Sequence, residues 1–173
     1  LNRLQVPTSQ LSSVIRVIMH CCSQEAQYNP FYAGILNRLT SYAQQYRFPC
    51  VCSVWDVTKE LATEAEQYPA GDRSTGAMAL ARKTVNMGKL AADLVDLGGV
   101  DMYVLKKVEF EELKGNNILF LHSFVMHLAA KQRSEDEIKN MIAPLNRNDI
   151  TNYTQSQRDK LKEEMGLKKK KGD

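Results

Sequence analysis

The sequence predicts an all-α protein built as a helical-repeat, HEAT-like stack of antiparallel helix pairs. Apolar residues recur at three- and four-residue spacing in one segment after another, as on the buried face of a helix. Short connections join these segments, which favours antiparallel packing of neighbouring helices. No segment convincingly alternates apolar and polar residues as a strand would, and 173 residues are enough for one domain with a substantial core.

The first two expected helices span residues 11–22 and 30–46. The expected buried stripe of the first consists of Leu11, Val14, Ile15, Ile18, Met19 and Cys22, with Cys21 packed beside it. Pro30 disfavours helical geometry at Asn29, so we expect Asn29 to cap the second helix and Pro30 to be its first residue. Phe31, Ile35, Leu39 and Tyr42 share one face of this helix.

A third helix is expected over residues 49–66, with Pro49 at its start and Trp55 as its anchor in the core. Its apolar face would also contain Val51, Val54, Thr58 and Leu61. Residues 67–76 (QYPAGDRSTG) lose the helical pattern and predict an exposed, mobile loop. A fourth helix follows over residues 77–97, and Gly98–Gly99 is expected to end it. Its predicted buried residues are Met78, Ala81, Val85, Leu90, Leu94 and Leu97.

The C-terminal part is more varied. Residues 100–113 fit either a short helix or an extended connection, and we favour a helical turn followed by extended chain at 107–109. Asn116 is expected to cap an interior helix over 117–131, with Ile118, Leu121, Val125 and Leu128 on its centre line. Ser134 and Glu137 have the capping-box spacing and open a helix expected to stop before Pro144. A last helix is expected over 155–165, and the lysine-rich tail 167–173 is expected to be disordered.

The charge of the chain is uneven. Residues 154–173 contain seven of the 23 Lys and Arg and four of the 20 Asp and Glu, so the formal net charge of +3 belongs to this tail. A broadly basic RNA-binding face is therefore not expected upstream, because phosphate contacts come mainly from clustered Lys and Arg. No run of about 18 apolar residues is present, so we expect no membrane span.

The cysteines and histidines do not have the spacing of a catalytic or metal site. The cysteines occur as Cys21-Cys22 and as Cys50 and Cys52, whereas zinc ligands within a pair usually have two to four residues between them. His122 and His127 are five residues apart and so do not share a helix face as an i, i+4 pair would. We expect reduced, packed thiols, no metal or other cofactor, and no enzymatic activity, since phosphate-loop and nucleophile motifs are also missing.

Several charged groups remain as candidates for binding, each with a structural alternative. Glu109, Glu111 and Glu112 are either an acidic docking patch for a basic partner or a solvated rim around Phe110. Glu25, Asp56 and Lys59 either dock a partner or pair with one another and the Asn29 turn. Lys168, Lys169, Lys170 and Lys171 are a solvated tail, an RNA-phosphate contact or a nuclear-import signal.

Three groups of residues resemble the MA-3 domain of the nucleolar scaffold proteins related to translation initiation factor 4G. The first group is Cys21-Cys22, Gln24-Glu25 and Tyr28-Asn29-Pro30-Phe31-Tyr32; the second is Ser53 with Trp55-Asp56; the third is residues 104–110 with Glu112-Leu113. The similarity runs from about Leu1 to beyond Leu128. It implies an MA-3-like domain over 1–166 that lacks one or more N-terminal helices, followed by the tail 167–173.

The resemblance also implies a function and partners. It implies a nucleolar scaffold that assembles the small ribosomal subunit and processes its RNA, with a DEAD-box RNA helicase and pre-ribosomal proteins as partners and no small-molecule substrate. The residues quoted for it add Tyr28 and Asn29 to the candidate docking residues. The alternatives are an RNA-binding module that uses the lysine tail and a related scaffold in splicing.

Overall fold

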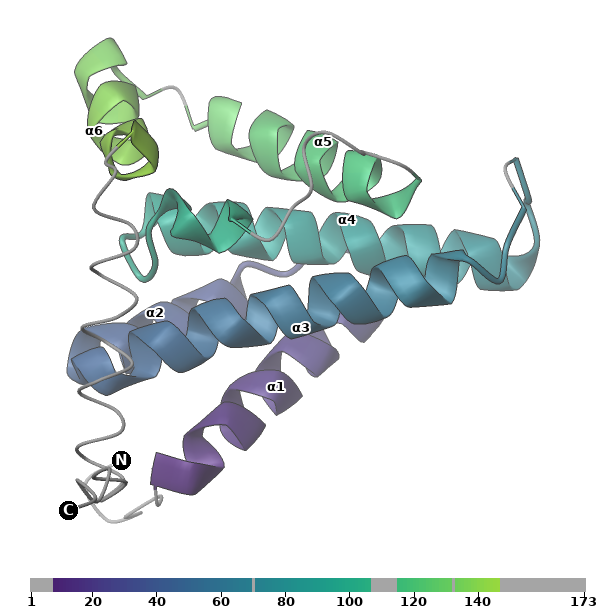
Figure 1. The fold of residues 1–173 in the computed structure, drawn as a ribbon, viewed down its shortest axis with the longest axis horizontal. Coiled ribbons are helices and arrows are strands. Elements are labelled where there is room, and N and C mark those ends of the chain that lie inside the picture. The colour runs from purple at the N-terminus through teal and green to yellow at the C-terminus, as the bar shows by residue number, and fades with distance from the viewer. Residues whose placement is uncertain (1–7, 70, 107–114, 132, 147–173) are drawn as a thin grey trace, which may run out of the picture.

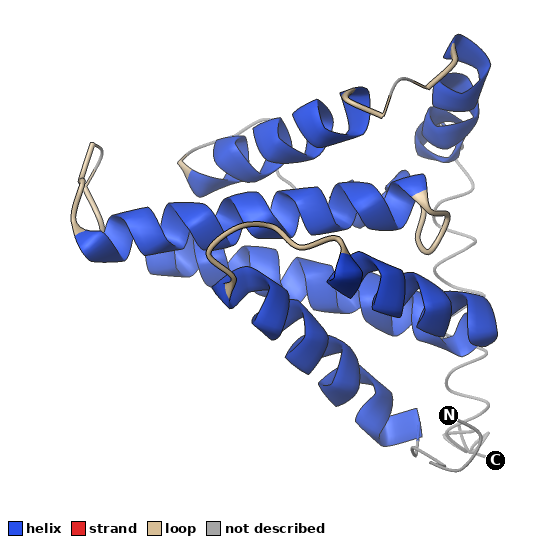
Figure 2. Cartoon of the chain, turned by 180° about the vertical axis from the view of Figure 1, so that it is seen from behind, coloured by secondary structure: helices blue, strands red, loops and turns tan. Residues whose placement is uncertain are grey.

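The computed structural model describes residues 8–69, 71–106, 115–131 and 133–146, and within these ranges the chain is helical and contains no strand (Figures 1 and 2). The α-helices are α1 (Thr8–Gln24), α2 (Phe31–Tyr42), α3 (Arg47–Ala65), α4 (Thr75–Asp96), α5 (Asn116–Ala129) and α6 (Glu135–Asn146), with short 3₁₀ helices η1 (Gln44–Tyr46) and η2 (Met102–Leu105). The predicted all-α, helical-repeat class is confirmed.

Helix α4 is the centre of the molecule. It contacts α1, α2, α3 and α5, and Figure 1 shows α5 along one side of it, α2 and α3 along the other, and α1 crossing at an angle. Its buried apolar residues include Leu80, Met87, Leu90, Ala91 and Leu94. The predicted burial of Met78 and Leu97 is wrong, because these residues are 65% and 48% exposed. Ala81 and Val85 are half-buried.

The buried faces of α1 and α2 differ in part from the expected ones. In α1, Leu11, Ile15, Met19 and Cys22 are buried, while Val14 and Cys21 are exposed. In α2 the buried residues are Ala33, Leu36 and Thr40. Phe31 and Tyr42, each 65% exposed, lie on the other side of the helix. Of the two adjacent cysteines that were expected to pack, only Cys22 lies in the core, and Cys21 is exposed.

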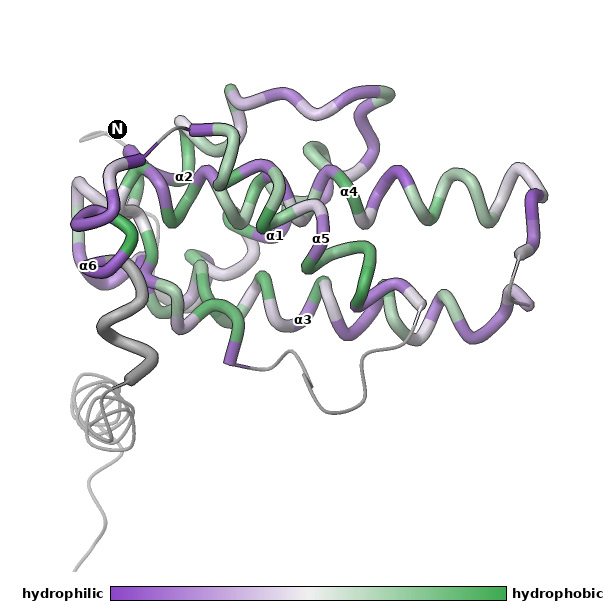
Figure 3. The backbone as a smooth tube through the Cα atoms, turned by 90° about the horizontal axis from the view of Figure 1, so that it is seen from above, coloured by the Kyte–Doolittle hydropathy of each residue, from purple (hydrophilic) through white to green (hydrophobic). Residues whose placement is uncertain are grey.

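Local signals at the helix ends are largely confirmed. The Asn29 side-chain oxygen accepts a hydrogen bond from the Phe31 amide at 3.0 Å. Helix α2 begins at Phe31, one residue later than predicted, and Pro30 before it has helical dihedrals. The positive φ of Gly98 (+73°) ends α4, and the Gly99 and Gly98 amides donate to the carbonyls of Leu94 and Val95, as in a Schellman motif. Ser74 caps the start of α4, after a loop that is hydrophilic (Figure 3) and mostly exposed.

Helix α3 begins two residues earlier than predicted, and Trp55 anchors it through a polar contact. Pro49 is the third residue of α3, a position where its missing N–H costs nothing because the first turn has no intrahelical acceptor. Helix α2 ends at Tyr42, Ala43 is extended, and η1 occupies the last three residues of the expected second helix. The half-buried Trp55 donates from Nε1 to the Val104 carbonyl at 2.8 Å, which ties α3 to η2.

Helix α5 is half-exposed, so its prediction as an interior helix is wrong. Phe120, Ser123 and Phe124 face α4, whereas Ile118 and Val125 are 51% and 50% exposed. Asn116 is the first helical residue and not the cap; its side chain donates to the Leu61 carbonyl at 3.3 Å.

The capping box that opens α6 is confirmed. The Glu137 amide donates to the Ser134 hydroxyl, and the Glu137 carboxylate accepts from the Ser134 amide. The helix continues through Pro144 to Asn146, so the expected stop before this proline is wrong. Residues 107–109, the expected helix 155–165 and the tail lie outside the described residues.

Candidate docking surface

The turn between α1 and α2 holds three of the predicted docking residues, Glu25, Tyr28 and Asn29. The buried Asn86 side chain of α4 donates to the backbone carbonyls of Cys22 at 3.2 Å and Glu25 at 2.9 Å. The Glu25 carboxylate accepts from the Tyr32 hydroxyl at 2.8 Å. The turn is thus fixed to α4 by side-chain contacts, and the Glu25 carboxylate is already engaged within the fold.

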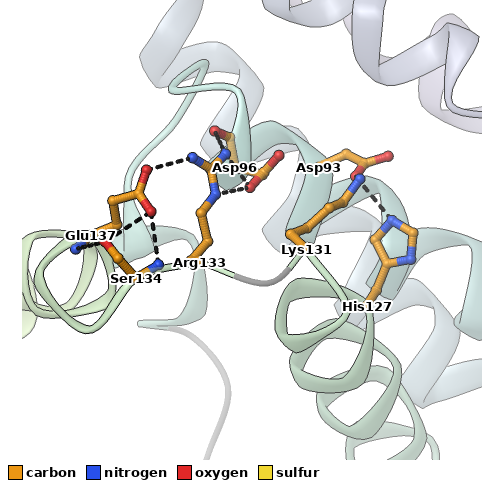
Figure 4. A network of polar contacts seen from close by, with 7 residues as sticks. All are labelled: Asp93, Asp96, His127, Lys131, Arg133, Ser134 and Glu137. Atoms are coloured by element: carbon orange, nitrogen blue, oxygen red, sulfur yellow. Dashed lines mark hydrogen bonds and ion pairs between the residues drawn. The ribbon is translucent and has the colours of Figure 1, made fainter.

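A buried carboxylate, Asp93 of α4, joins this turn to α5. One of its oxygens accepts from the Tyr28 hydroxyl at 2.5 Å. The other lies 2.9 Å from Nε2 of His127 and 2.8 Å from Nζ of Lys131. The Tyr28 ring packs edge-on against the His127 ring, with centroids 5.4 Å apart. Figure 4 shows His127 of α5 and Lys131, which follows α5, reaching toward Asp93.

The pKa values follow from these contacts. Burial alone would raise the pKa of Asp93, but the hydrogen bonds from Lys131, Tyr28 and His127 outweigh it and lower the pKa below its ordinary value. Burial, and then the hydrogen bond to Asp93, raises the pKa of the Tyr28 hydroxyl well above its ordinary value. Asp93 is therefore ionised and Tyr28 neutral at physiological pH, which is the arrangement that the hydrogen bond requires.

A groove lies beside the turn. Its volume is about 370 Å³, and it is lined by Ala26, Gln27, Tyr28, Arg82, Val85, Asn86 and Lys89. Arg82, Val85, Asn86 and Lys89 have three- and four-residue spacing, so they share one face of α4. We call this the turn–α4 groove.

Asp56 and Lys59 lie on another surface. Asp56 of α3 is 4.0 Å from Arg16 of α1, and Arg16 also pairs with Glu60 at 2.5 Å. A second groove of about 440 Å³ lies between α1 and α3; it is lined by Arg16, Val17, His20, Ser23, Gln24, Val57, Glu60, Leu61, Glu64 and Lys83. Among the described residues, Asp56 thus pairs with Arg16 and not with Lys59 or the Asn29 turn, and Lys59 has no ion pair with Glu25 or Asp56. Glu109, Glu111, Glu112 and the lysines 168–171 lie outside the described residues.

A second polar cluster fixes the start of α6 to the end of α4. Arg133 bonds the Asp96 carboxylate at 2.5 Å and pairs with Glu137 at 3.2 Å. Hydrogen bonds from the Ser134 backbone and side chain, and then from Arg133, lower the pKa of Glu137. Figure 4 shows Arg133 between Asp96 and Glu137, so α6 is attached through charged groups at its N-terminal end.

The groups that metal chemistry would use are dispersed. Within the described ranges no three His, Cys, Asp or Glu side chains are grouped so as to hold a metal ion. The four cysteines are free thiols, and burial raises the pKa of Cys22 and Cys50 to about 12, which keeps them protonated. In the same residues, no helix is both long and apolar enough to cross a bilayer.

Comparison with known proteins agrees with this architecture. Residues 1–62 match the MA3 domain. Over 136 aligned residues the chain is 30% identical to human nucleolar MIF4G domain-containing protein 1. The aligned segment covers 79% of this chain and 14% of the human protein. The chain is 29% identical over 122 residues to suppressor of glycerol defect protein 1 of Schizosaccharomyces pombe, 70% of this chain and 15% of that protein. No solved structure gave a significant match.

The comparisons confirm the resemblance to the MA-3 domain of nucleolar scaffold proteins. The matched residues 1–62 contain α1, α2 and most of α3, including the turn and Asp56. The human relative and its mouse counterpart are both named as nucleolar proteins, which supports the predicted nucleolar localisation. The chain spans about one seventh of the length of these relatives.

Sequence reasoning missed the residues of α4, of α5 and of the turn after α5 that pack around the α1–α2 turn. These are Arg82, Asn86, Lys89, Asp93, His127 and Lys131. The shared helical face of Arg82, Asn86 and Lys89 was available from their spacing alone. The pairing of Asp93 with groups from the turn and α5 was not, because it depends on how three distant segments pack.

Proposed function

We propose that this chain is a non-enzymatic docking domain of a nucleolar scaffold that acts in assembly of the small ribosomal subunit and processing of its RNA, together with a DEAD-box RNA helicase. The observation that carries the proposal is the MA3 match over residues 1–62 combined with similarity to nucleolar MIF4G domain-containing proteins. MA3 and MIF4G modules are protein-interaction scaffolds, and such scaffolds are generally not catalytic.

The geometry is consistent with docking. The turn between α1 and α2 is fixed in place by Asn86 and Asp93, so a partner would meet a preorganised surface at little cost in conformational entropy. Two open grooves have charged linings, one between α1 and α3 and one between the turn and α4. Electrostatic complementarity at charged surfaces of this kind supplies specificity and speeds association.

Affinity purification of the tagged full-length protein tests the proposal. The expected co-purifying species are small-subunit precursors and a DEAD-box helicase, and removal of this domain should reduce the recovery of at least one of them. Recovery of splicing particles alone would favour the related splicing scaffold and contradict the ribosomal role. Unchanged recovery of every partner without the domain would show that it does not dock them.

The lysine run supports a second candidate function, direct RNA binding. Four consecutive lysines, 168–171, follow a part of the chain whose charges balance. They would give modest, sequence-independent and salt-sensitive affinity through counterion release. A mobility-shift assay across a salt series separates the two: strong RNA binding by a variant without the tail would contradict a purely protein-docking role.

A further inference from the structure

The turn–α4 groove carries an unbalanced positive charge. Its lining contains two cations, Arg82 and Lys89, and no carboxylate. Two other cations are neutralised: Lys83 of α4 pairs with Glu64 at 3.1 Å, and Lys131, just after α5, pairs with Asp93 at 2.8 Å. Within the described residues neither Arg82 nor Lys89 pairs with an acid.

The carboxylates nearest the groove along the chain are already engaged elsewhere. Glu25 accepts from the Tyr32 hydroxyl, and Asp93 is 3% exposed and bonded to Tyr28, His127 and Lys131. Releasing either acid to pair with the groove cations would break hydrogen bonds that hold the turn. Among the residues that the structure describes, no carboxylate is therefore a counterion for Arg82 or Lys89, and an anionic partner would be.

The spacing of the two cations sets the form of this partner. Seven residues of an α-helix rise about 10 Å and return to nearly the same face. In a polyproline II segment, residues three apart lie on one side at a separation of about 9 Å. Two carboxylates three residues apart in an extended segment thus match Arg82 and Lys89. Val85 lies between the two cations in sequence and, with the Tyr28 ring, gives the groove an apolar contact for an intervening side chain.

We infer that the turn–α4 groove binds an extended acidic segment of a partner protein, with acidic residues three apart that pair with Arg82 and Lys89. This inference rests on the proposed docking function and names the chemistry of one partner. RNA is disfavoured at this groove, because nucleic-acid affinity grows with the number of phosphates neutralised and the groove offers only two cations.

Fluorescence anisotropy with the whole chain tests the inference. The probe is a labelled peptide with glutamates three residues apart and proline and alanine between them. The wild-type chain should bind it, and the double variant Arg82→Glu/Lys89→Glu should bind at least about tenfold more weakly, since like charges oppose association. Arg82→Gln/Lys89→Gln should also weaken binding. This neutral variant tests the same two side chains if the charge-reversed variant fails to fold. Circular dichroism checks that each variant retains its helix content.

Matched controls make the result specific. Arg38→Glu/Arg73→Glu reverses the same number of charges at exposed positions outside the groove and should leave the affinity within about twofold. The same peptide with glutamines in place of glutamates should bind at least about tenfold more weakly. Equal loss in both charge-reversed variants, or no binding by the wild-type chain, would overturn the inference.

Two further outcomes separate this inference from the proposed function. An oligouridylate that binds the wild-type chain more tightly than the acidic peptide, with the same dependence on Arg82 and Lys89, would overturn the inference in favour of RNA. Recovery of small-subunit precursors by the full-length protein decides the proposed function independently. If the full-length protein recovers no small-subunit precursors but the chain still binds the acidic peptide, the ribosomal role is contradicted and the acidic-segment site is supported.

Discussion

Asp93 shows how one side chain fixes the relative positions of three segments. A buried carboxylate is costly unless it is paired and hydrogen-bonded. Asp93 meets this requirement with Tyr28 from the turn, His127 from α5 and Lys131 from just after α5. Because these donors come from different segments, each bond constrains the packing of one segment on another. The turn–α4 groove depends on this, since Tyr28 forms part of its wall.

Replacement of Asp93 by asparagine should destabilise the fold by about 1.5 to 3 kcal/mol, the range for hydrogen bonds to a charged group. The folded-state pKa of Asp93 is lowered, so its contribution is complete above the unfolded value of about 3.9 and is lost as pH falls through the folded value. The stability difference between wild type and Asp93→Asn should therefore be largest near neutral pH and shrink below about pH 4. Urea unfolding at several pH values measures it.

The control for this substitution is Asp56→Asn, at an exposed carboxylate 4.0 Å from Arg16. Surface ion pairs contribute little, so this variant should differ from wild type by less than about 0.5 kcal/mol at every pH. An Asp93→Asn deficit that stays constant from neutral to acidic pH would contradict a role for the ionised carboxylate.

Loss of the Asn29 cap gives a second prediction for a single residue. Asn29→Ala removes the acceptor of the Phe31 amide and should cost about 1 kcal/mol. Asn29→Gly should cost only a few tenths, because glycine exposes the amide to water. Thermal or urea unfolding measures both. Equal losses for the two variants would indicate that Asn29 stabilises the turn by some other contact.

Residues that act within one turn of chain were predictable from sequence, and those that act across the fold were not. Asn29, Gly98 and Ser134 were identified because a cap depends on neighbours a few residues away. Asp93 was not, since its partners lie 34 to 65 residues away. For the same reason the sequence did not show that the predicted docking residues lie on two different surfaces, because spacing could not reveal that Asp56 faces Arg16 on α1.

Helices α4 and α5 approach each other closely at Gly88. A side chain here would place its Cβ 2.6 Å from the Phe120 carbonyl oxygen and 2.9 Å from Cβ of Ser123. Both atoms belong to α5, and the oxygen is backbone, so neither can move away without shifting the helix. Gly88 thus permits the approach of α5 that brings His127 and Lys131 to Asp93.

Gly88→Ala should destabilise the protein by about 1 to 3 kcal/mol through overpacking, even though alanine favours helix formation. The matched control is Gly34→Ala in α2, where an added Cβ meets nothing within 4 Å. That variant should be more stable than wild type by about 0.5 to 1 kcal/mol, the difference in helix propensity. Chemical denaturation of both tests the contact, and a stabilised Gly88→Ala protein would contradict it.

The periodicity of apolar residues predicted that the helices exist, but it predicted only part of the face that each helix buries. Helix α4 is contacted by four other helices, so its burial extends around much of its circumference and an apolar stripe does not define one inner face. Helix α5 is apolar nearly all round, yet it covers α4 on one side only, which leaves Ile118 and Val125 exposed. Helix α6 passes Pro144, because a proline weakens a helix without always ending it.

At the scale of the whole molecule, charge divides the chain into a balanced body and a basic tail. The body has its ion pairs distributed between helices, as in Arg16 with Glu60 and Arg133 with Asp96. The turn–α4 groove, whose lining holds two cations and no carboxylate, suits an acidic segment and not a nucleic acid. The tail, with lysines 168–171, contains the positive charge that RNA binding requires. Protein docking and RNA contact would thus use separate parts of the chain.

Replacement of lysines 168–171 by glutamine should separate these two roles. A lysine run has no apolar side chains to bury, so the melting temperature should not change, whereas any RNA affinity should fall and its dependence on salt should become shallower. The acidic-peptide affinity of the turn–α4 groove should stay at the wild-type value. Thermal unfolding, mobility shift across a salt series and peptide anisotropy on the same protein measure the three quantities. A large drop in melting temperature would mean that the tail packs on the body, and weakened peptide binding would place the acidic-segment site in the tail.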